Sequence, residues 1–179
     1  MPRIDAPAIE TAPTGSQPQL AAVKKQLGVV PNMFRTIAHS PAALEGYLGL
    51  NGALAKGSLD AATRERIALA VAEFNGCNYC LAAHTYIGKN LANLSDSEIE
   101  SNRRGRSSDA KANAAVVFAT MVVAGRGQVS EAELLAVRAA GHTEADIIEI
   151  IAHAALNTLT NYVNEVAGTA VGFPAAASL

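Results

Sequence analysis

The sequence predicts an all-α protein without a β-sheet, and three observations carry this prediction. From Gln19 onward the chain is rich in Ala, Leu and Ile, and aromatic residues make up only 4 % of it. It lacks the alternating β-branched runs and the hairpin signals that strands require. Glycines, prolines and capping side chains recur where helices would begin and end. We expect a helical bundle in one domain, residues 19–168, between an N-terminal arm (1–18) and a C-terminal tail (169–179).

The N-terminal arm and the first helix are defined by proline and glycine. Four prolines fall between residues 2 and 18 and interrupt any helical period. We expect this segment to be extended and to lie across the surface of the protein or of a neighbouring subunit. The first helix, 19–27, ends at Gly28 and Pro31, and we expect a non-helical link after it.

Capping residues mark where the other helices begin. Ser40 stands before a proline suited to the first helical position, and an Asn-Gly pair at 75–76 separates two consecutive helices. Three later pairs have the spacing of a capping box: Ser95 with Glu98, Ser130 with Glu133, and Thr143 with Asp146. The predicted helices are 41–56, 60–74, 77 to 88 or 90, two short ones from Ser95 and Ser130, 109–124 and 143–167. Helix 109–124 is apolar and should be buried, whereas 103–108 is interpreted as a solvated polar loop.

Composition argues against several classes of function. With 179 residues, 50 % hydrophobic and 17 % charged, the chain is long enough for one ordinary core. The net charge is −2, and outside Arg103-Arg104-Gly105-Arg106 no basic stripe is present to bind nucleic acid. No apolar signal segment or membrane span is evident, so we expect a cytoplasmic protein. No glycine-rich phosphate loop follows a strand, so no nucleotide cofactor is expected.

The segment from Glu65 to His84 carries the strongest functional signal. If Cys77 begins a helix, Cys77 and Cys80 both lie in its first turn, where free amides and the helix dipole stabilise a thiolate. Cys77, Cys80 and His84 are separated by three and four residues, so they share one helix face. A histidine one turn beyond a cysteine can take its proton. Glu65 points with apolar residues on the preceding helix, which suits a base that relays protons to a histidine.

The pattern Glu-x11-Cys-x2-Cys-x3-His resembles that of the alkylhydroperoxidase-D-like, carboxymuconolactone decarboxylase superfamily. The stretch Gly28-Val29-Val30-Pro31-Asn32-Met33-Phe34 is similar to its peroxidase-related branch, and the likeness covers roughly residues 20–165. This resemblance implies an all-helical bundle that assembles into trimers or hexamers, and peroxide reduction by a thiol pair. It also implies that Cys80 is the attacking thiolate, Cys77 the resolving thiol, His84 the proton acceptor and Glu65 the residue that completes the relay.

Two features bear on this assignment. Tyr79 stands where the pattern has a histidine before the second cysteine, so a second imidazole in the relay is absent. The helix dipole favours Cys77 as the attacking sulfur, whereas the spacing to His84 and the resemblance favour Cys80. We therefore expect Cys80 to be the attacking sulfur, because a specific base has a larger effect than a partly screened dipole.

Further candidates for the pocket are Tyr79, Glu73, His153 and Asn157. Glu73, one turn before Cys77, competes with Glu65 for the carboxylate role, with a surface acid as the alternative. Tyr79 either lines the pocket with its hydroxyl or packs at a subunit contact. On the last helix a polar line recurs at offsets of four: His153, Asn157, Asn161 and Glu165. It is interpreted as a solvated edge or a hydrogen-bonded interface, with His153 or Asn157 facing the thiols as the alternative.

The functional prediction is a thiol-dependent alkyl hydroperoxidase of antioxidant defence. Its substrate would be a small organic hydroperoxide or hydrogen peroxide, and an external dithiol would regenerate the cysteines. One alternative is a lactone enzyme of the wider superfamily that does not depend on the cysteine pair. The other is a non-enzymatic redox-sensing or metal-binding helical protein, in which zinc would need His39, His142 or His153 beside the cysteines. No metal is expected.

Overall fold

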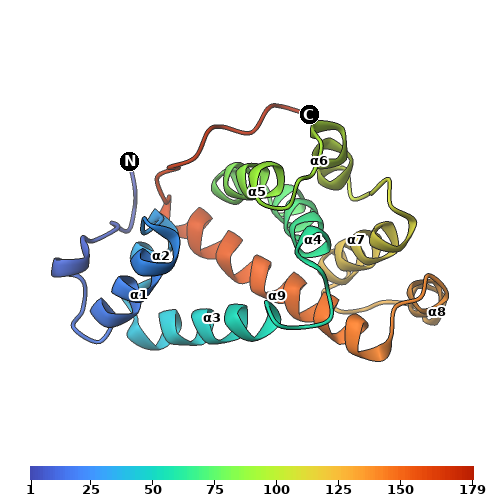
Figure 1. Cartoon of the computed structure of the whole chain (residues 1–179), viewed down its shortest axis with the longest axis horizontal. Helices are drawn as coiled ribbons and strands as arrows, with labels where there is room; N and C mark the ends of the chain where they lie inside the picture. Colours follow the sequence, from blue (N-terminus) through green and yellow to red (C-terminus); the bar gives the residue numbers. More distant parts are fainter.

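The computed structural model describes residues 1–179 and contains no strand, which confirms the all-α prediction (Figure 1). The elements in chain order are the 3-10 helix η1 (Ile9–Thr11) and the α-helices α1 (Gln17–Leu27), α2 (Asn32–Ile37), α3 (Pro41–Leu54), α4 (Ala61–Phe74), α5 (Asn78–Asn90), α6 (Asp96–Arg103), α7 (Ala110–Ala124), α8 (Glu131–Ala139) and α9 (Glu144–Ala167). None of them combines the length and the apolar character that crossing a membrane requires.

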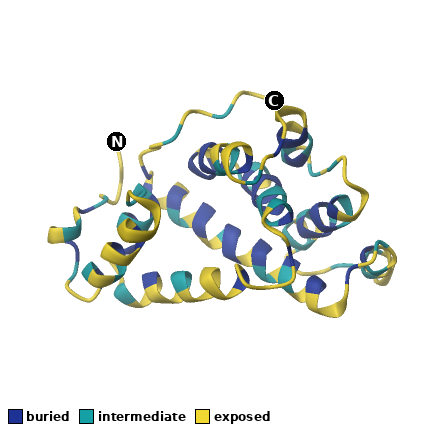
Figure 2. Cartoon of the chain, viewed as in Figure 1, coloured by how far each residue is buried: buried dark blue, intermediate teal, exposed yellow.

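Helices α4 and α9 form the centre of the molecule. α4 packs against α5, α6, α7 and α9, and α9 also contacts α2, α3, α5 and α7 (Figure 1). Residues 67–72 of α4 are all buried, because this helix has neighbours around its whole circumference (Figure 2). One apolar core lies between α4, α7 and α9. A second core joins α1, α2 and the start of α5, and it holds both cysteines.

The predicted caps begin most of the helices. Ser40, Asp60 and Ser130 each accept a hydrogen bond from the backbone amide three residues on. Complete capping boxes are present at Ser130 and Thr143. These helix starts depend only on neighbouring residues, which is why the sequence predicts them.

The capping box predicted at Ser95 is only half-formed. Ser95 accepts from the Glu98 amide, but the Glu98 carboxylate is turned toward Arg66 of α4 and the hydroxyls of Ser107 and Ser108. Burial raises the pKa of Glu98, but hydrogen bonds from these serines and Asn102 outweigh it and hold the pKa well below its usual range. Glu98 therefore joins α6 to α4, a contact that local spacing does not predict.

The link expected after Gly28 is wrong in part, because α2 lies within it. Met33, Thr36 and Ile37 of this helix are buried, and α2 packs against α3 and α9. A helix of six residues is too short to show a helical period and is stabilised mainly by its tertiary contacts.

Two expectations about burial are also corrected. Only one face of α7 is buried, through Ala112, Ala115, Val116, Phe118 and Ala119, so this apolar helix leaves an apolar face at the surface. The loop expected at 103–108 is not simply solvated. Arg103 is the last residue of α6, and its nearly buried side chain donates from Nε to Glu73 at 2.7 Å.

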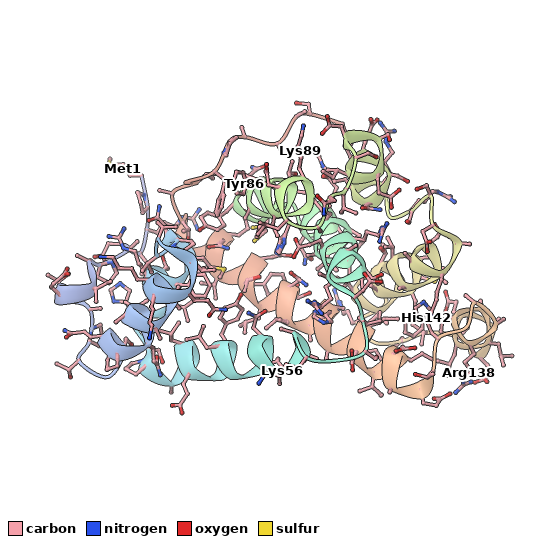
Figure 3. The ribbon with its side chains drawn as sticks, viewed as in Figure 1. Met1, Lys56, Tyr86, Lys89, Arg138 and His142 are labelled. Atoms are coloured by element: carbon pink, nitrogen blue, oxygen red, sulfur yellow. The ribbon has the colours of Figure 1, made fainter.

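The C-terminal tail crosses over α5 toward α6 (Figure 1). Phe173 packs edge-on against Tyr79, with ring centroids 5.9 Å apart, and lies 6.0 Å from Tyr86, which Figure 3 labels on α5. Farther along, the Arg103 guanidinium donates to the carbonyl oxygen of Ala177 at 2.6 Å. The tail therefore packs on α5, the helix that carries Cys80.

Candidate functional site

The two cysteines lie at the turn between α4 and α5. α4 ends at its cap Asn75, and Gly76 adopts a φ of 68°, a left-handed conformation that glycine accepts without strain. Cys77 is the N-cap of α5, and its sulfur accepts a hydrogen bond from the Cys80 amide at 3.4 Å. Cys80 lies in the first turn of the same helix. This turn places both sulfurs together at the start of α5.

The two sulfurs are 2.8 Å apart and are not joined in a disulfide. Cys77 is fully buried, and 3 % of Cys80 is exposed. The Cys77 thiol donates to the Cys80 sulfur, and this is the main reason that the pKa of Cys80 is lowered to about 6. Burial opposes the shift, while the positive charge of His84 supports it. The same hydrogen bond, burial and the charge of Cys80 raise the pKa of Cys77. These opposite shifts make Cys80 the more acidic of the two thiols.

Glu65 of α4 and His84 of α5 form an ion pair between these two helices. Nδ1 of His84 lies 2.8 Å from Oε2 of Glu65. Because a carboxylate only accepts hydrogen bonds, Nδ1 carries a proton and Nε2 is left to exchange one. Burial lowers the pKa of His84, but the charge and hydrogen bond of Glu65, with the charge of Cys80, raise it on balance. The His84 and Glu65 side chains are 21 % and 18 % exposed, so the pair can exchange protons with solvent.

The Glu73 carboxylate is paired with Arg103 of α6. Its Oε2 accepts from Nε of Arg103 at 2.7 Å, so its carboxylate is occupied by an ion pair with α6. Of the two carboxylates that the sequence offers for the relay, Glu65 is the one whose oxygen meets His84.

Tyr79 contacts α2 rather than an open pocket. Its hydroxyl accepts a hydrogen bond from the Met33 amide at 3.2 Å, and its side chain is buried. Burial is the main reason that its pKa is raised. Tyr79 thus links α5 to α2.

The polar line on α9 is buried at His153, Asn157 and Asn161, so its interpretation as a solvated edge is wrong for these three residues, whereas Glu165 is exposed. The Asn157 amide donates to the His153 carbonyl within the helix, at 2.8 Å. The pKa of His153 is lowered, mainly by burial, and its Nε2 has no hydrogen-bond partner. Neither His153 nor Asn157 forms a hydrogen bond with a cysteine.

Asn164 is a site residue that the sequence analysis misses. Its Nδ2 donates to the Cys80 sulfur at 3.2 Å. At about 100° per residue, a line drawn at offsets of four drifts by about 40° at each step. Counted from His153, Asn164 lies only about 20° from the same face, whereas Glu165 lies about 120° away. A spacing of eleven residues from His153 is the sequence signal that would have identified Asn164.

Tyr47 of α3 is a second residue outside the sequence prediction. Burial, followed by the negative charges of Cys80 and Glu65, raises its pKa, so the hydroxyl stays protonated near these two groups. Its ring packs edge-on against Phe34, with centroids 5.7 Å apart. A single tyrosine on a helix distant in sequence gives no local signal that could have identified it.

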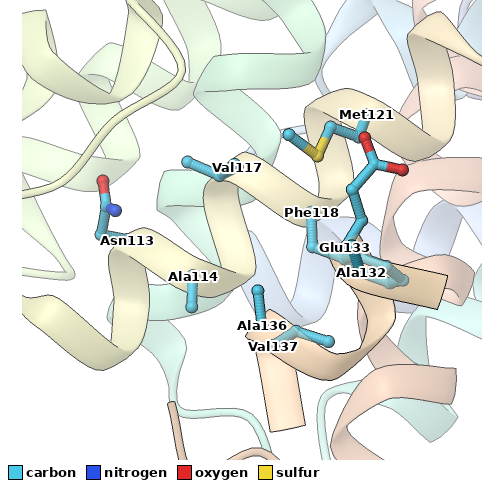
Figure 4. A pocket seen from close by; sticks show the side chains of 9 residues that line it. All are labelled: Asn113, Ala114, Val117, Phe118, Met121, Ala132, Glu133, Ala136 and Val137. Atoms are coloured by element: carbon cyan, nitrogen blue, oxygen red, sulfur yellow. The ribbon is translucent and has the colours of Figure 1, made fainter. Parts of the chain in front are cut away.

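Two surface cavities lie away from the cysteines. An apolar one of about 370 Å³ lies between α7 and α8 and includes Phe118, Met121 and Val137 (Figure 4). A polar one of about 230 Å³ lies where α4, α7 and α9 begin, and includes His142. None of the predicted site residues lines either cavity. No group of three or more His, Cys, Asp or Glu side chains is arranged to hold a metal ion.

Comparison with known proteins points to one superfamily. Residues 41–124, which extend from α3 to α7 and include both cysteines, match the model of the carboxymuconolactone decarboxylase family. A peroxidase-related protein from Ralstonia eutropha, described as an alkylhydroperoxidase AhpD core, has a TM-score of 0.85 and 26 % identity over 96 % of this chain and 92 % of its own. A peroxidase-related protein from Silicibacter has a TM-score of 0.81 and 25 % identity over 94 % and 91 % of the two chains.

Two further similarities are more limited. The debrominase Bmp8 shares the fold, with a TM-score of 0.78 and 17 % identity over 94 % of this chain and 90 % of that chain. An uncharacterised protein from Haemophilus influenzae is 43 % identical over 63 residues, which are 35 % of this chain. The match spans 50 % of that relative's length.

Proposed function

We propose that this chain reduces hydroperoxides with Cys77 and Cys80. The premise is that it belongs to the alkylhydroperoxidase-D-like, carboxymuconolactone decarboxylase superfamily and to its peroxidase-related branch. The observation that carries the proposal is the pair of sulfurs 2.8 Å apart, of which Cys80 has a lowered pKa and Cys77 a raised one. This is the chemical arrangement that peroxide attack followed by disulfide formation requires.

In the first step the Cys80 thiolate attacks the outer oxygen of the hydroperoxide. An S–O bond forms and the O–O bond breaks, so that Cys80 is oxidised to a sulfenic acid and the peroxide is reduced to an alcohol or water. The leaving oxygen takes a proton from His84, whose pKa is raised by its pairing with Glu65. Glu65 then restores the proton on His84 from solvent.

In the second step the Cys77 thiol attacks the Cys80 sulfenic acid. A disulfide forms, and the hydroxyl leaves as water with the Cys77 proton. The sulfurs are already adjacent, so we expect little movement of the backbone. An external dithiol returns the pair to the reduced state by exchange. We propose a small organic hydroperoxide or hydrogen peroxide as the substrate and antioxidant defence in the cytoplasm as the role.

The first test is titration of free thiols in the reduced, metal-free protein before and after one equivalent of cumene hydroperoxide. We expect both thiols to disappear within seconds and to return with a dithiol. The rate should rise as the pH rises through about 6, where Cys80 loses its proton, and fall again as the pH rises through the raised pKa of His84, which then has no proton to donate. Below the pKa of Cys80 the thiol predominates and is a poor nucleophile.

Other outcomes favour the alternatives. Unreactive thiols together with stoichiometric zinc in the untreated protein would contradict peroxide reduction and favour a metal-binding protein. Lactone conversion that persists when both thiols are blocked would favour the lactone enzyme.

We also propose that the chain self-associates, as a trimer or hexamer, through the outer face of α9. Five large apolar residues on this face are 38–65 % exposed: Ile148, Ile151, Leu159, Tyr162 and Val166. The chain exposes 9226 Å², whereas a monomer of its mass is expected to expose about 8,200 Å². The excess is close to the area of about 800 Å² that each partner buries in a standard interface.

A Tyr162→Asp variant should therefore form smaller assemblies, because it places a charge on this apolar face. Size-exclusion chromatography with light scattering measures the change. Leu91→Asp is the matched control, since Leu91 is 72 % exposed and is the C-cap of α5 rather than a residue of α9. A monomeric wild-type protein, or an unchanged assembly in both Tyr162→Asp and Leu159→Asp, would contradict the proposed interface.

A further inference from the structure

We infer that two amide side chains of α9, Asn164 and Asn161, form a cradle that binds the negative charge on the Cys80 sulfur. The inference rests on the proposed function, in which Cys80 is the attacking thiolate. It adds to the thiol pair and the Glu65–His84 pair a third group of residues, supplied by a helix that lies more than 80 positions later in the chain.

Asn164 has its amide nitrogen directed at the sulfur. Nδ2 donates to the Cys80 sulfur at 3.2 Å, while Oδ1 is buried and has no partner. Buried amide groups are normally satisfied on both atoms. This orientation is favourable when the sulfur is an anion, because hydrogen bonds to charged acceptors are about twice as strong as those between neutral groups.

Asn161 is held in place from the opposite side. The Asn75 amide donates to Oδ1 of Asn161 at 2.9 Å, which sets the orientation of the Asn161 side chain, and its buried Nδ2 has no hydrogen-bond partner. Asn161 and Asn164 are three residues apart, so they share one side of α9. Asn75 is a positioning residue, because it acts on the sulfur only through Asn161.

The Cys80 sulfur accepts two hydrogen bonds, from the Cys77 thiol and from the Asn164 amide. The Cys77 thiol has the largest effect on the pKa of Cys80, and the hydrogen bond from Asn164 and the neighbouring amide of Asn161 lower it further. Because burial works in the opposite direction, the buried sulfur needs these donors to remain a thiolate. The cradle therefore compensates for removing the charge from water.

The inference is tested by the pH dependence of Cys80 alkylation with iodoacetamide, followed by mass spectrometry of the Cys80 peptide. In Asn164→Leu, which keeps the size but removes the donor, the midpoint should rise by about one to two pH units. Asn164→Asp should raise it further, since its carboxylate repels the thiolate. Asn157→Leu is the control, because the Asn157 amide is buried on the same helix but bonds only to the His153 carbonyl.

An unchanged midpoint in folded Asn164→Leu and Asn164→Asp overturns the inference, and so does an equal rise in Asn157→Leu. If the Asn164 variants fail to fold, Asn161→Leu and Asn75→Ala test the same cradle through its other amide, and an unchanged midpoint in both overturns it. Alkylation needs no peroxide, so the two proposals fail separately. A wild-type thiolate that ignores cumene hydroperoxide would contradict the proposed function and leave the cradle intact.

Discussion

A Cys80→Ser variant should lose hydroperoxide reduction completely. The pKa of the Cys80 thiol is lowered to about 6, whereas a serine hydroxyl supplies no comparable anion at neutral pH. Cys77 cannot substitute for it, because Cys77 is fully buried and burial raises the pKa of its thiol. Turnover is measured as consumption of cumene hydroperoxide in the presence of a dithiol, with circular dichroism to verify the fold.

A Cys77→Ser variant should instead complete one turnover and then stop. Cys80 still attacks the peroxide, but no resolving thiol follows, so the protein accumulates Cys80 sulfenic acid. Trapping with dimedone and mass spectrometry detects that species. Equal and undiminished turnover in the two variants would rule out the division of roles between the sulfurs.

The second large effect is expected from Glu65→Gln. The glutamine is nearly the same size but carries no charge, so it cannot hold the positive charge on His84 at 2.8 Å. The pKa of His84 should fall, and the rate of peroxide reduction at pH 7 should drop by about a hundredfold, a typical contribution of acid–base catalysis. Single-turnover kinetics of thiol loss measure this rate.

The ion pair between Glu65 and His84 should also affect the free energy of unfolding. The folded protein raises the pKa of His84 above its ordinary value of 6.5, so the pair contributes stability that is fully present below that value. This contribution is lost as the pH rises through the folded-state pKa. The difference in unfolding free energy between the wild type and Glu65→Gln should therefore shrink toward alkaline pH.

Glu73→Gln is the matched control for Glu65→Gln. It weakens the ion pair with Arg103 and should lower the melting temperature, but the Glu73 carboxylate does not meet His84. We expect its rate of peroxide reduction to stay within a few-fold of the wild type. A hundredfold loss in Glu73→Gln, with Glu65→Gln active, would reverse the assignment of the relay carboxylate.

Tyr79 is the position at which this chain differs from the cysteine-histidine pattern of the superfamily. Where that pattern has a histidine, the Tyr79 hydroxyl accepts from the Met33 amide and the ring contacts Phe173 of the tail. The position therefore supplies packing between α2, α5 and the tail. His84 is the imidazole that pairs with a carboxylate beside the cysteines.

Local chemistry accounts for the part of the site that could be predicted. Cys77, Cys80 and His84 share a face because helical periodicity fixes their relative directions. Glu65 reaches His84 because a short turn at Asn75 and Gly76 folds α5 back along α4, so residues at similar distances from the turn meet. The choice between Glu65 and Glu73 could not be made in this way. It depends on Arg103 of α6, which takes the Glu73 carboxylate.

The helical class, most helix starts and the spacing of the thiols follow from the sequence, since these depend on caps and periodicity within a few residues. Which distant side chains reach the sulfur depends instead on how the helices pack. Asn164 is 84 positions from Cys80, and its role depends on how α9 crosses α4 and α5. The burial of the α9 amides and the packing of the tail on α5 also arise from the docking of whole helices. No local sequence pattern specifies this docking.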